Sequence, residues 1–293
     1  MALCTRRNFL KSSLAVTALS SVASAAVKRT ATDWVTLGDS GVKVTRLAFG
    51  TGTYGGRIQR ELGQEDFTRL VRHAYDRGIR FFETAESYNG MPEMLGTALK
   101  GIPRDNYKLM TKYTVHQDED PSTKIDMFRK QLNAEYFDIL LLHCMRQPTW
   151  SDEMKRLQDG FSESKSKKVI LAHGASVHGL PALRTFPGNK WLDIAMIRMN
   201  HNGTRMDIDN VKEADLPGKV DEVVATTRKM KAQGAGVISM KLVGEGRFTR
   251  AEDRDAAMKF AMNLGSVDCV TLGFKNTGEI DEAIDRMSRV MNT

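Results

Sequence analysis

The sequence predicts an α/β fold, a closed (β/α)8 TIM barrel preceded by a β-hairpin. From Leu47 to the end of the chain, short apolar runs typical of strands alternate with longer helical patterns. Eight such strand–helix units follow one another, which favours a closed barrel over an open doubly wound sheet. No repeat or low-complexity linker interrupts them, so residues 33–293 are expected to form one domain.

The expected hairpin consists of two short alternating runs, Trp34–Leu37 and Val42–Thr45, around the turn residues Asp39-Ser40-Gly41. The first long helical pattern, Glu65–Arg77, is followed by Gly78, the residue type expected in a left-handed helix cap. Further strands are expected at Ile79–Glu83, Lys108–Lys112, Phe137–His143, Val169–Ser176, Trp191–Met199, Gly236–Val243 and Cys269–Gly273. Further helices are expected at Pro92–Leu99, Ser122–Asn133, Ser151–Lys165, Leu180–Phe186, Lys219–Gln233, Ala251–Asn263 and Gly278–Met291.

The N-terminal residues form a separate signal. The run from Thr5 to Lys11, which contains Arg6-Arg7, matches a twin-arginine export motif, and a weakly apolar run and the cleavage sequence Ala23-Ser24-Ala25 follow it. Residues 1–25 are therefore expected to be a signal peptide that the twin-arginine (Tat) export machinery recognises, and the protein is expected in the periplasm. Because this route accepts folded proteins, it suggests a ligand loaded in the cytoplasm. The alternative is a disordered basic tail.

Composition excludes several other classes. The formal net charge of +7 is accompanied by no basic stripe interleaved with aromatic residues, so nucleic acid is not an expected partner. No apolar stretch reaches the roughly 20 residues of a membrane span. The Cys and His residues show no metal-ligand spacing, so no metal site is expected. Cys144 and Cys269 can pair in an oxidising compartment, but buried free thiols are the preferred interpretation.

Four side chains in the first half of the chain carry the functional prediction. Glu83, Lys112 and His143 each close a strand-like run, and Tyr88 lies in the loop after the first of these runs. If the strands are parallel neighbours, their C-terminal ends place an acid, a phenol, an ammonium and an imidazole around one cavity. Reversible proton donation to a carbonyl oxygen requires this set. Each residue alone also has a plain structural interpretation, as a packed tyrosine, a solvated lysine or a structural histidine.

The chemistry assigns a role to each group. A hydride that arrives at a carbonyl carbon leaves negative charge on the oxygen, and Tyr88 is the expected proton donor. A free phenol has a pKa near 10, and the Lys112 ammonium is expected to lower the pKa of Tyr88 by about one to three units. His143 is expected to hydrogen-bond the carbonyl oxygen, and a buried carboxylate at Glu83 to keep Lys112 charged and aimed.

From about Asp33 to its end, the chain resembles the aldo-keto reductase superfamily. The resemblance is carried by the hairpin that runs into Gly50-Thr51-Gly52-Thr53-Tyr54, by the segment from Phe82 to Tyr88, and by the segment from Tyr136 to His143. It implies a (β/α)8 barrel that reduces aldehydes and ketones with a nicotinamide cofactor bound across the barrel mouth, without a Rossmann domain. It implies catalytic roles for Tyr88, Lys112 and His143. Glu83 stands where the family has aspartate, and its extra methylene is expected to cost about 1–3 kcal/mol of strain.

The resemblance also implies cofactor contacts. Those for the nicotinamide and its neighbours are Gly52, Thr53, Tyr54, Ser176, Asn200 and Met240, with Val177, Met196 and Met240 in place of the family's asparagine, glutamine and stacking aromatic residue. Lys241, followed by Gly244-Glu245-Gly246, is a candidate pyrophosphate cradle, although an ordinary strand end is an equal alternative. Gly273 and Lys275 precede a helix N-terminus, where phosphate is favoured. Lys275 suggests NADP, although Glu279 stands where the family often has arginine; NAD is the alternative.

Three functions follow from these features. The first is an NAD(P)H-dependent oxidoreductase that reduces a small aldehyde or ketone to an alcohol, or catalyses the reverse. The second is a barrel of the same fold that has lost turnover and serves as a nucleotide-binding or regulatory protein, motivated by Glu83, Val177, Met196 and Met240. The third, a metal-dependent sugar isomerase, needs converging acidic and histidine ligands that cannot be assembled from different strand ends. Trp150, Trp191 and His116 are candidate mouth residues, with burial in the outer shell equally expected for the two tryptophans.

Overall fold

The structure, a computed structural model, describes residues 28–114, 120–210 and 216–293. The expected signal peptide and His116 lie outside these residues. Among the helices of the described part, none has the length and apolar character that crossing a membrane requires.

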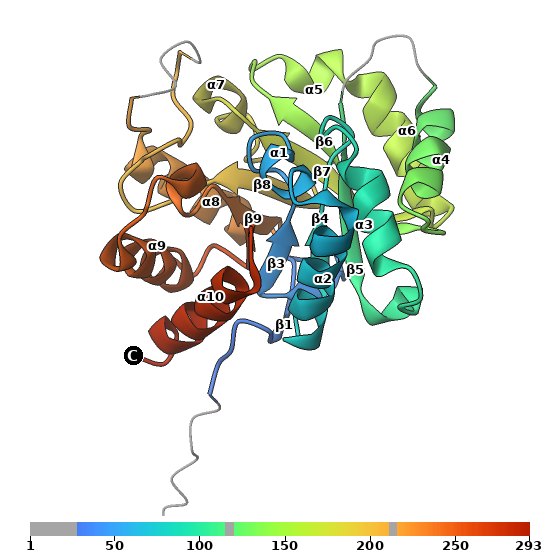
Figure 1. Cartoon of the computed structure of the whole chain (residues 1–293). Helices are drawn as coiled ribbons and strands as arrows, with labels where there is room; N and C mark the ends of the chain where they lie inside the picture. Colours follow the sequence, from blue (N-terminus) through green and yellow to red (C-terminus); the bar gives the residue numbers. More distant parts are fainter. Residues whose placement is uncertain (1–27, 115–119, 211–215) are drawn as a thin grey trace, which may run out of the picture.

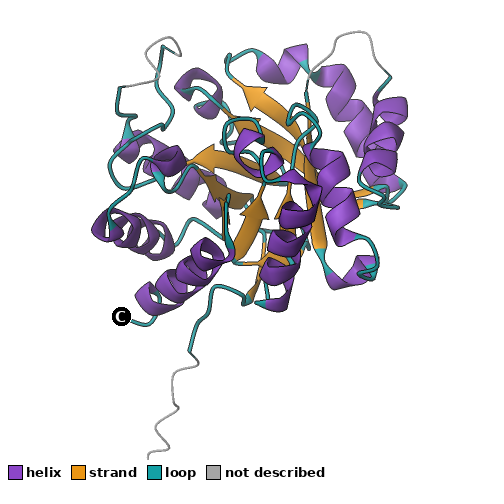
Figure 2. Ribbon diagram, in the orientation of Figure 1, coloured by secondary structure: helices purple, strands orange, loops and turns teal. Residues whose placement is uncertain are grey.

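A closed barrel of parallel strands forms the centre of the molecule (Figures 1 and 2). Its strands follow one another around the barrel in chain order, and β10 pairs with β3 to close it. They are β3 (Leu47–Gly50), β4 (Phe81–Glu83), β5 (Lys108–Tyr113), β6 (Phe137–Met145), β7 (Ile170–Val177), β8 (Ile194–Arg198), β9 (Gly236–Met240) and β10 (Cys269–Leu272). The predicted fold class is confirmed.

Helices surround the barrel, as the purple ribbons around the orange strands in Figure 2 show. They are α1 (Arg57–Arg60), α2 (Gly63–Asp76), α3 (Met91–Leu99), α4 (Pro121–Gln131), α5 (Trp150–Glu153), α6 (Lys155–Ser166), α7 (Leu180–Leu183), α8 (Val220–Ala232), α9 (Ala251–Asn263) and α10 (Thr277–Val290), with the 3-10 turns η1 (Arg104–Asn106) and η3 (Gly244–Gly246). The helix expected at 151–165 is divided at Met154 into α5 and α6. The single turn α1 was not predicted, because four residues carry no periodic pattern.

Two apolar clusters lie on opposite faces of the strands. Alternate residues such as Phe81, Ile139 and Met196 fill the barrel interior, while their neighbours in the chain, such as Phe82 and Leu140, pack against the helices. This period of two is what a closed sheet with covered faces requires. It means that a strand-end residue two or four positions beyond an interior residue points into the top of the barrel.

The predicted hairpin closes the end of the barrel opposite the mouth. β1 (Trp34–Thr36) pairs antiparallel with β2 (Lys43–Thr45), and the pair lies at the lower end of the molecule in Figure 1. Leu37, Val42 and Val44 join the cluster that fills the barrel interior. Gly236 at the start of β9 lets the hairpin approach, since a Cβ there would lie 2.8 Å from the Cβ of Leu37.

Candidate active site

The four residues of the predicted catalytic set meet at the mouth of the barrel. The Lys112 ammonium lies 3.2 Å from the Tyr88 hydroxyl and forms an ion pair with Glu83. It also donates to the carbonyl oxygen of Thr84 at 2.9 Å. Lys112 and Glu83 are 1% and 2% exposed, so the ion pair lies in a low-dielectric region where an unpaired charge would be costly. The structure thus brings the phenol, the ammonium and the carboxylate into direct contact.

Tyr88 is held by the loop that follows β4 and by the loop that follows β3. Its backbone N–H donates to the carbonyl of Ala85 at 3.1 Å, and its ring lies over the Lys112 ammonium, 4.7 Å from the ring centroid. Gly52 leaves the space for the hydroxyl, because a Cβ at that position would lie 2.6 Å from it. Gly52 is therefore needed for the position of Tyr88.

His143 stands beside Tyr88, with the two rings edge-to-face and their centroids 5.6 Å apart. Its Nδ1 lies 3.1 Å from the hydroxyl oxygen of Ser87. Burial, followed by the charge of Lys112, holds the pKa of His143 well below its usual range, so the imidazole is neutral. If the Ser87 hydroxyl donates to Nδ1, the Nε2–H of His143 is the group that can donate to a ligand.

The expected effect of Lys112 on the pKa of Tyr88 is wrong. Burial, and after it the negative charge of Glu83, raise the pKa of Tyr88 well above its ordinary value. The ammonium of Lys112 is held by the Glu83 carboxylate, whose charge opposes a phenolate nearby. Burial lowers the pKa of Lys112, and Glu83 acts in the opposite direction. Tyr88 is therefore a protonated phenol, the form that donates a proton.

Glu83 fits without displacing Lys112, because the strand on its other side carries a glycine. A Cβ at Gly50 of β3 would lie 2.9 Å from Oε2 of Glu83 and 2.7 Å from Oγ1 of Thr271. Thr271 of β10 donates to the same carboxylate oxygen at 3.4 Å. The longer acid therefore occupies space that Gly50 leaves open, and the strain expected from its extra methylene has a local relief.

A cavity of about 550 Å³ begins at Tyr88 and extends between the loops after β3, β9 and β10 toward α9 and α10. Most of the predicted cofactor contacts line it, namely Gly52, Thr53, Tyr54, Met240, Lys241, Gly273 and Lys275. Gln59 also lines it, and Oε1 of this buried side chain has no hydrogen-bond partner among the described residues. A ligand with donor groups would satisfy this oxygen.

Two predicted cofactor contacts lie elsewhere. Ser176 is fully buried, and its hydroxyl accepts from the backbone N–H of Cys144 at 2.9 Å. The side chain of Asn200, also fully buried, donates to the carbonyl oxygens of Thr204 and Lys241 at 2.7 and 3.2 Å. Neither lines the cavity. Both fix the loops at the mouth, so in this structure they shape the site without facing it.

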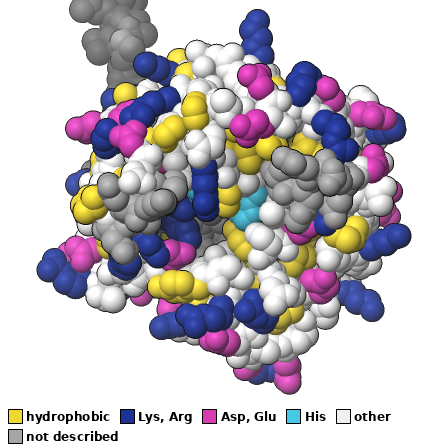
Figure 3. All heavy atoms as spheres, turned by 90° about the horizontal axis from the view of Figure 1, so that it is seen from above, with side chains coloured by type: hydrophobic (Ala, Val, Ile, Leu, Met, Phe, Trp, Pro, Cys, Tyr) yellow, Lys and Arg dark blue, Asp and Glu magenta, His cyan; other side chains and the backbone are white. Residues whose placement is uncertain are grey.

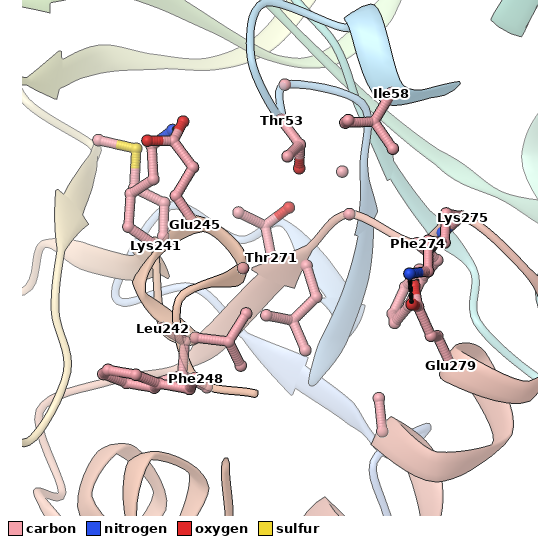
Figure 4. Close-up of a pocket in the computed structure, with 18 of the residues that line it drawn as sticks. Thr53, Ile58, Lys241, Leu242, Glu245, Phe248, Thr271, Phe274, Lys275 and Glu279 are labelled. Atoms are coloured by element: carbon pink, nitrogen blue, oxygen red, sulfur yellow. Dashed lines mark hydrogen bonds and ion pairs between the residues drawn. The ribbon is translucent and has the colours of Figure 1, made fainter. Parts of the chain in front are cut away.

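Each of the two predicted phosphate-binding lysines already pairs with the carboxylate of a glutamate. Figure 4 shows Lys241 with Glu245 at one side of the cavity and Lys275 with Glu279 at the other. Lys241 forms an ion pair with Glu245, whose carboxylate is also 3.3 Å from Arg205. Glu279 accepts from the backbone N–H of Lys275 at 2.9 Å, and its other oxygen is 3.6 Å from the Lys275 ammonium. An incoming phosphate must compete with these acids.

Sequence reasoning missed a charged group at the far end of the cavity. Arg254 of α9 and Arg286 of α10 line it and share the carboxylate of Glu282, each at 2.7 Å. The only pattern that marks them is the Glu282–Arg286 spacing of four residues, which is common on solvated helices. In contrast, Trp150 packs on Phe186 and is buried in the outer shell, and Trp191 stacks on His173 with centroids 4.5 Å apart. Neither tryptophan lines the cavity.

The two cysteines of the described residues, Cys144 and Cys269, are free, as predicted, but Cys144 is partly exposed rather than buried. Cys144 follows His143 at the mouth, and its sulfur lies 3.3 Å from Nδ1 of His178. Cys269 begins β10 at the hairpin end, where its sulfur contacts the carbonyl of Thr45 at 3.4 Å. The two thiols are at opposite ends of the barrel, so a disulfide between them would require a large backbone movement.

Comparisons with curated proteins give partial matches. The chain is 27% identical over 174 residues to "Probable aldo-keto reductase 1" of Glycine max, covering 51% of this chain and 50% of that protein. It is 26% identical over 203 residues to versiconal hemiacetal acetate reductase of Aspergillus parasiticus, covering 58% and 59%. It is 33% identical over 118 residues to L-galactose dehydrogenase of Arabidopsis thaliana, covering 37% and 36%. The matches thus span between 36% and 59% of the length of these relatives.

Solved structures match over most of the chain. An aldo-keto reductase from Bacillus halodurans, in its holo form, has a TM-score of 0.68 at 17% identity, covering 89% of this chain and 95% of that one. A glycerol dehydrogenase from Gluconobacter oxydans has a TM-score of 0.62 at 18% identity, covering 87% and 90%. At such identities the likeness concerns the fold. The profile of the Aldo/keto reductase family matches residues 46–290, and the chain therefore belongs to the aldo/keto reductase family.

Proposed function

We propose that this protein is an NAD(P)H-dependent oxidoreductase that reduces an aldehyde or ketone to an alcohol, or catalyses the reverse. The observation that carries the proposal is the contact of 3.2 Å between the Lys112 ammonium and the Tyr88 hydroxyl, with Glu83 paired behind the lysine. The family membership and the named reductases and dehydrogenases among its relatives support the same reaction class.

The cavity residues fit a nicotinamide dinucleotide. The cavity adjoins Tyr88, and the partnerless oxygen of Gln59 offers an acceptor to the ligand. The residues that would hold the cofactor are Gly52, Thr53, Tyr54, Met240, Lys241, Gly273 and Lys275. When bound, the cofactor supplies the hydride. Ser176 and Asn200 do not line the cavity, and their contact with the cofactor stays a prediction.

The protein's own side chains donate the proton and stabilise the charges that its transfer creates. Tyr88 gives the proton of its hydroxyl to the carbonyl oxygen as negative charge develops there, and the Lys112 ammonium stabilises the phenolate that remains. Glu83 keeps Lys112 charged in its buried position. The neutral His143 donates a hydrogen bond to the same carbonyl oxygen and orients it. The phenolate then recovers a proton from solvent, which completes the reduction.

The expected preference for NADP over NAD stays a prediction. Lys275 supports it, because its exposed ammonium can meet a 2′-phosphate. Glu279 opposes it, because its carboxylate already accepts from the backbone N–H of Lys275. Direct titration of NADPH and NADH by fluorescence decides between the two.

The test of the function is Tyr88→Phe, which removes the hydroxyl and keeps the ring. Carbonyl-dependent oxidation of NADPH or NADH is expected to fall by about 10²- to 10⁴-fold in kcat, with nucleotide affinity retained. Tyr136→Phe is the matched control, because the hydroxyl of Tyr136 donates a hydrogen bond to the exposed Asp105, away from the mouth. Equal turnover by the Tyr88→Phe variant and the unaltered protein would reject the mechanism.

A second candidate is a nucleotide-binding or regulatory barrel without turnover. It is favoured by Met240 and Met196, which line the cavity at positions where the family has cofactor-binding aromatic and amide groups. Nucleotide binding with no carbonyl-dependent oxidation across a panel of aldehydes and ketones would favour this candidate. Among the described residues, no group of three or more His, Cys, Asp or Glu side chains gathers as a metal site, so nothing in them favours a sugar isomerase.

We also propose that the chain is exported to the periplasm by the twin-arginine pathway. The support is the Arg6-Arg7 motif and the Ala23-Ser24-Ala25 cleavage sequence. A variant with both Arg6→Lys and Arg7→Lys is expected to stay in the cytoplasm as the full-length precursor, whereas Arg29→Lys is processed normally. Cell fractionation measures the compartment of each variant, and N-terminal sequencing shows whether its signal peptide has been removed. Export of the double-lysine variant at the normal level would contradict this localisation.

A further inference from the structure

Arg198 is a second cation at the top of the barrel, and the proposed reaction does not use it. Ile194 and Met196 of β8 belong to the cluster inside the barrel, so the alternation of the strand turns Arg198 to the same side. Its side chain is 21% exposed. Inward positions of such barrels are mostly occupied by branched apolar residues, and a largely buried cation is costly unless something compensates it.

The partners of Arg198 do not saturate its guanidinium. One terminal nitrogen donates to Nδ1 of His178 at 2.8 Å. The other is 3.6 Å from Oδ1 of Asp207, beyond hydrogen-bond distance. By the same criterion, Nε of Arg198 and both carboxylate oxygens of the buried Asp207 have no partner. Burial also raises the pKa of Asp207 to about 7, so near neutral pH its negative charge is incomplete.

His178 adds a donor beside this guanidinium. A guanidinium only donates, so Nδ1 of His178 must accept from Arg198, and the ring hydrogen is on Nε2, where it faces only a weak acceptor, Sγ of Cys144 at 3.7 Å. Burial, and then the charge of Arg198, hold the pKa of His178 well below its usual range, so the ring is neutral in this tautomer. Both side chains are partly exposed. Histidine and Lys or Arg side chains gather in the hollow of this face in Figure 3.

The pair lies next to the catalytic set, because β7 and β8, at whose ends it lies, follow β6 with His143 in the barrel order, whereas Tyr88 follows β4 on the other side of β6. The ring centroids of His143 and His178 are 6.1 Å apart, and those of His143 and Tyr88 are 5.6 Å apart. A molecule whose carbonyl oxygen meets Tyr88 and His143 would extend its other end toward His178 and Arg198. A benzaldehyde with a para carboxylate carries its two polar groups at opposite ends in this way.

We propose that the substrate carries a carboxylate in addition to its carbonyl group, and that Arg198 and the Nε2–H of His178 bind this carboxylate. The proposal rests on the proposed reductase function and names the substrate class of the same site. The fork of donors on arginine matches the two oxygens of a carboxylate, and charged hydrogen bonds of this kind are stronger than neutral ones. A carboxylate would also supply the negative charge that Asp207 provides only in part.

The experiment compares 4-formylbenzoate with its methyl ester, which has a similar shape and no charge. The unaltered protein is expected to prefer 4-formylbenzoate in kcat/KM by about 10- to 100-fold. In the double variant Arg198→Met, Asp207→Asn, which removes the cation together with its acid, this ratio is expected to approach one, mainly through KM. Arg198→Lys keeps the charge without the fork and should give an intermediate ratio. Arg146→Met, which removes an exposed rim cation, is the control and should keep the preference.

A ratio near one in the unaltered protein, or an undiminished ratio in the double variant, overturns the inference. A second measurement separates it from the reductase proposal. In the presence of nucleotide, benzoate is expected to raise the melting temperature of the unaltered protein but not of the double variant, whose own melting temperature reports its folding. No turnover of either aldehyde together with this selective shift would reject the reductase function and keep the carboxylate site. Absence of the shift in the unaltered protein would reject the carboxylate site.

Discussion

At the scale of single residues, Glu83 shows how a chain can carry a longer acid at the centre of a packed site. The carboxylate reaches Lys112 because Gly50 has no side chain on the facing strand and because Thr271 donates to the second oxygen. Glu83, Gly50 and Thr271 come from β4, β3 and β10, which are neighbours in the barrel. The glutamate at position 83 thus depends on Gly50 and Thr271, and a test of Glu83 should also change one of these neighbours.

We predict a favourable coupling between Gly50→Ala and Glu83→Asp. Gly50→Ala alone is expected to lower the free energy of unfolding by about 1–3 kcal/mol, because its Cβ would crowd the Glu83 carboxylate. In the Glu83→Asp background the carboxylate is withdrawn, so the same change should cost less, with a coupling of about 0.5–3 kcal/mol. Urea unfolding of the four proteins in the cycle measures it. Strict additivity would show that Gly50 and Glu83 do not depend on each other.

We predict a flat pH dependence of carbonyl reduction across the neutral range. Tyr88 must be protonated, and its pKa lies well above the ordinary 10.0, so this form persists as the pH rises to that value. His143 must be neutral, and its pKa lies well below the ordinary 6.5, so this form persists as the pH falls to that value. We expect kcat/KM to change little between these limits. A descending limb near pH 7 to 8 would contradict the environment assigned to Tyr88.

The positions of three candidate catalytic residues could be predicted from the sequence, because each of them closes a recognisable apolar run at a strand end. Glu83, Lys112 and His143 were placed in this way, and the closed barrel brings them together. The protonation state of Tyr88 could not be predicted, because it depends on how deeply the loop is buried and on which side of Lys112 the acid lies. Ser176 and Asn200 were assigned to the cofactor by resemblance, yet their hydrogen bonds in the structure go to the backbone of β6 and of the loop after β8.

At the scale of elements, the approach of β7 to β8 depends on one residue. A Cβ at Gly174 would lie 1.8 Å from the carbonyl oxygen of Ile194. No rotamer can relieve this distance, because the backbone fixes the position of a Cβ and the oxygen is itself a backbone atom. The sequence predicted both strands from their apolar runs. It could not predict this contact, because the pairing of the two strands sets it. The division of α5 from α6 at Met154 was missed for a similar reason, since the helical periodicity continues across the break.

We predict that Gly174→Ala destabilises the protein by about 3 kcal/mol, at the upper end of the usual cost of overpacking. The added methyl group forces β7 and β8 apart and disturbs the mouth that both strands support. Gly278→Ala is the matched control, because this glycine is exposed near the start of α10, where a Cβ would meet only Oδ1 of Asn276 at 3.3 Å. Urea unfolding compares the two. A cost for Gly174→Ala no larger than that of the control would contradict the described strand pairing.

At the scale of the whole molecule, the cavity links the barrel to its outermost helices. It is lined by loops after β3, β9 and β10 and by side chains of α9 and α10. A ligand that fills it would therefore contact all of these elements at once. Anything that binds the folded state alone stabilises it by mass action.

We predict that NADPH or NADH raises the melting temperature of the protein. At a nucleotide concentration 100 times its dissociation constant, the stabilisation is about 2.7 kcal/mol, which corresponds to a shift of about 5–10 °C for a domain near this size. Glu279→Gln should increase the shift with NADPH more than that with NADH, because it removes a negative charge beside a 2′-phosphate. Differential scanning fluorimetry measures both. The absence of any shift with either nucleotide would reject the cofactor assignment.

The hairpin at the far end of the barrel also has a consequence for the chemistry at the mouth. Leu37, Val42 and Val44 cover the base of the packed barrel interior, so water does not reach the Lys112–Glu83 pair from this end. Without that cover, the field of the pair at the Tyr88 oxygen would weaken, because water screens charges far better than packed side chains. The β1–β2 hairpin, although distant from every reacting atom, would then help to set the electrostatic field in which the reaction takes place.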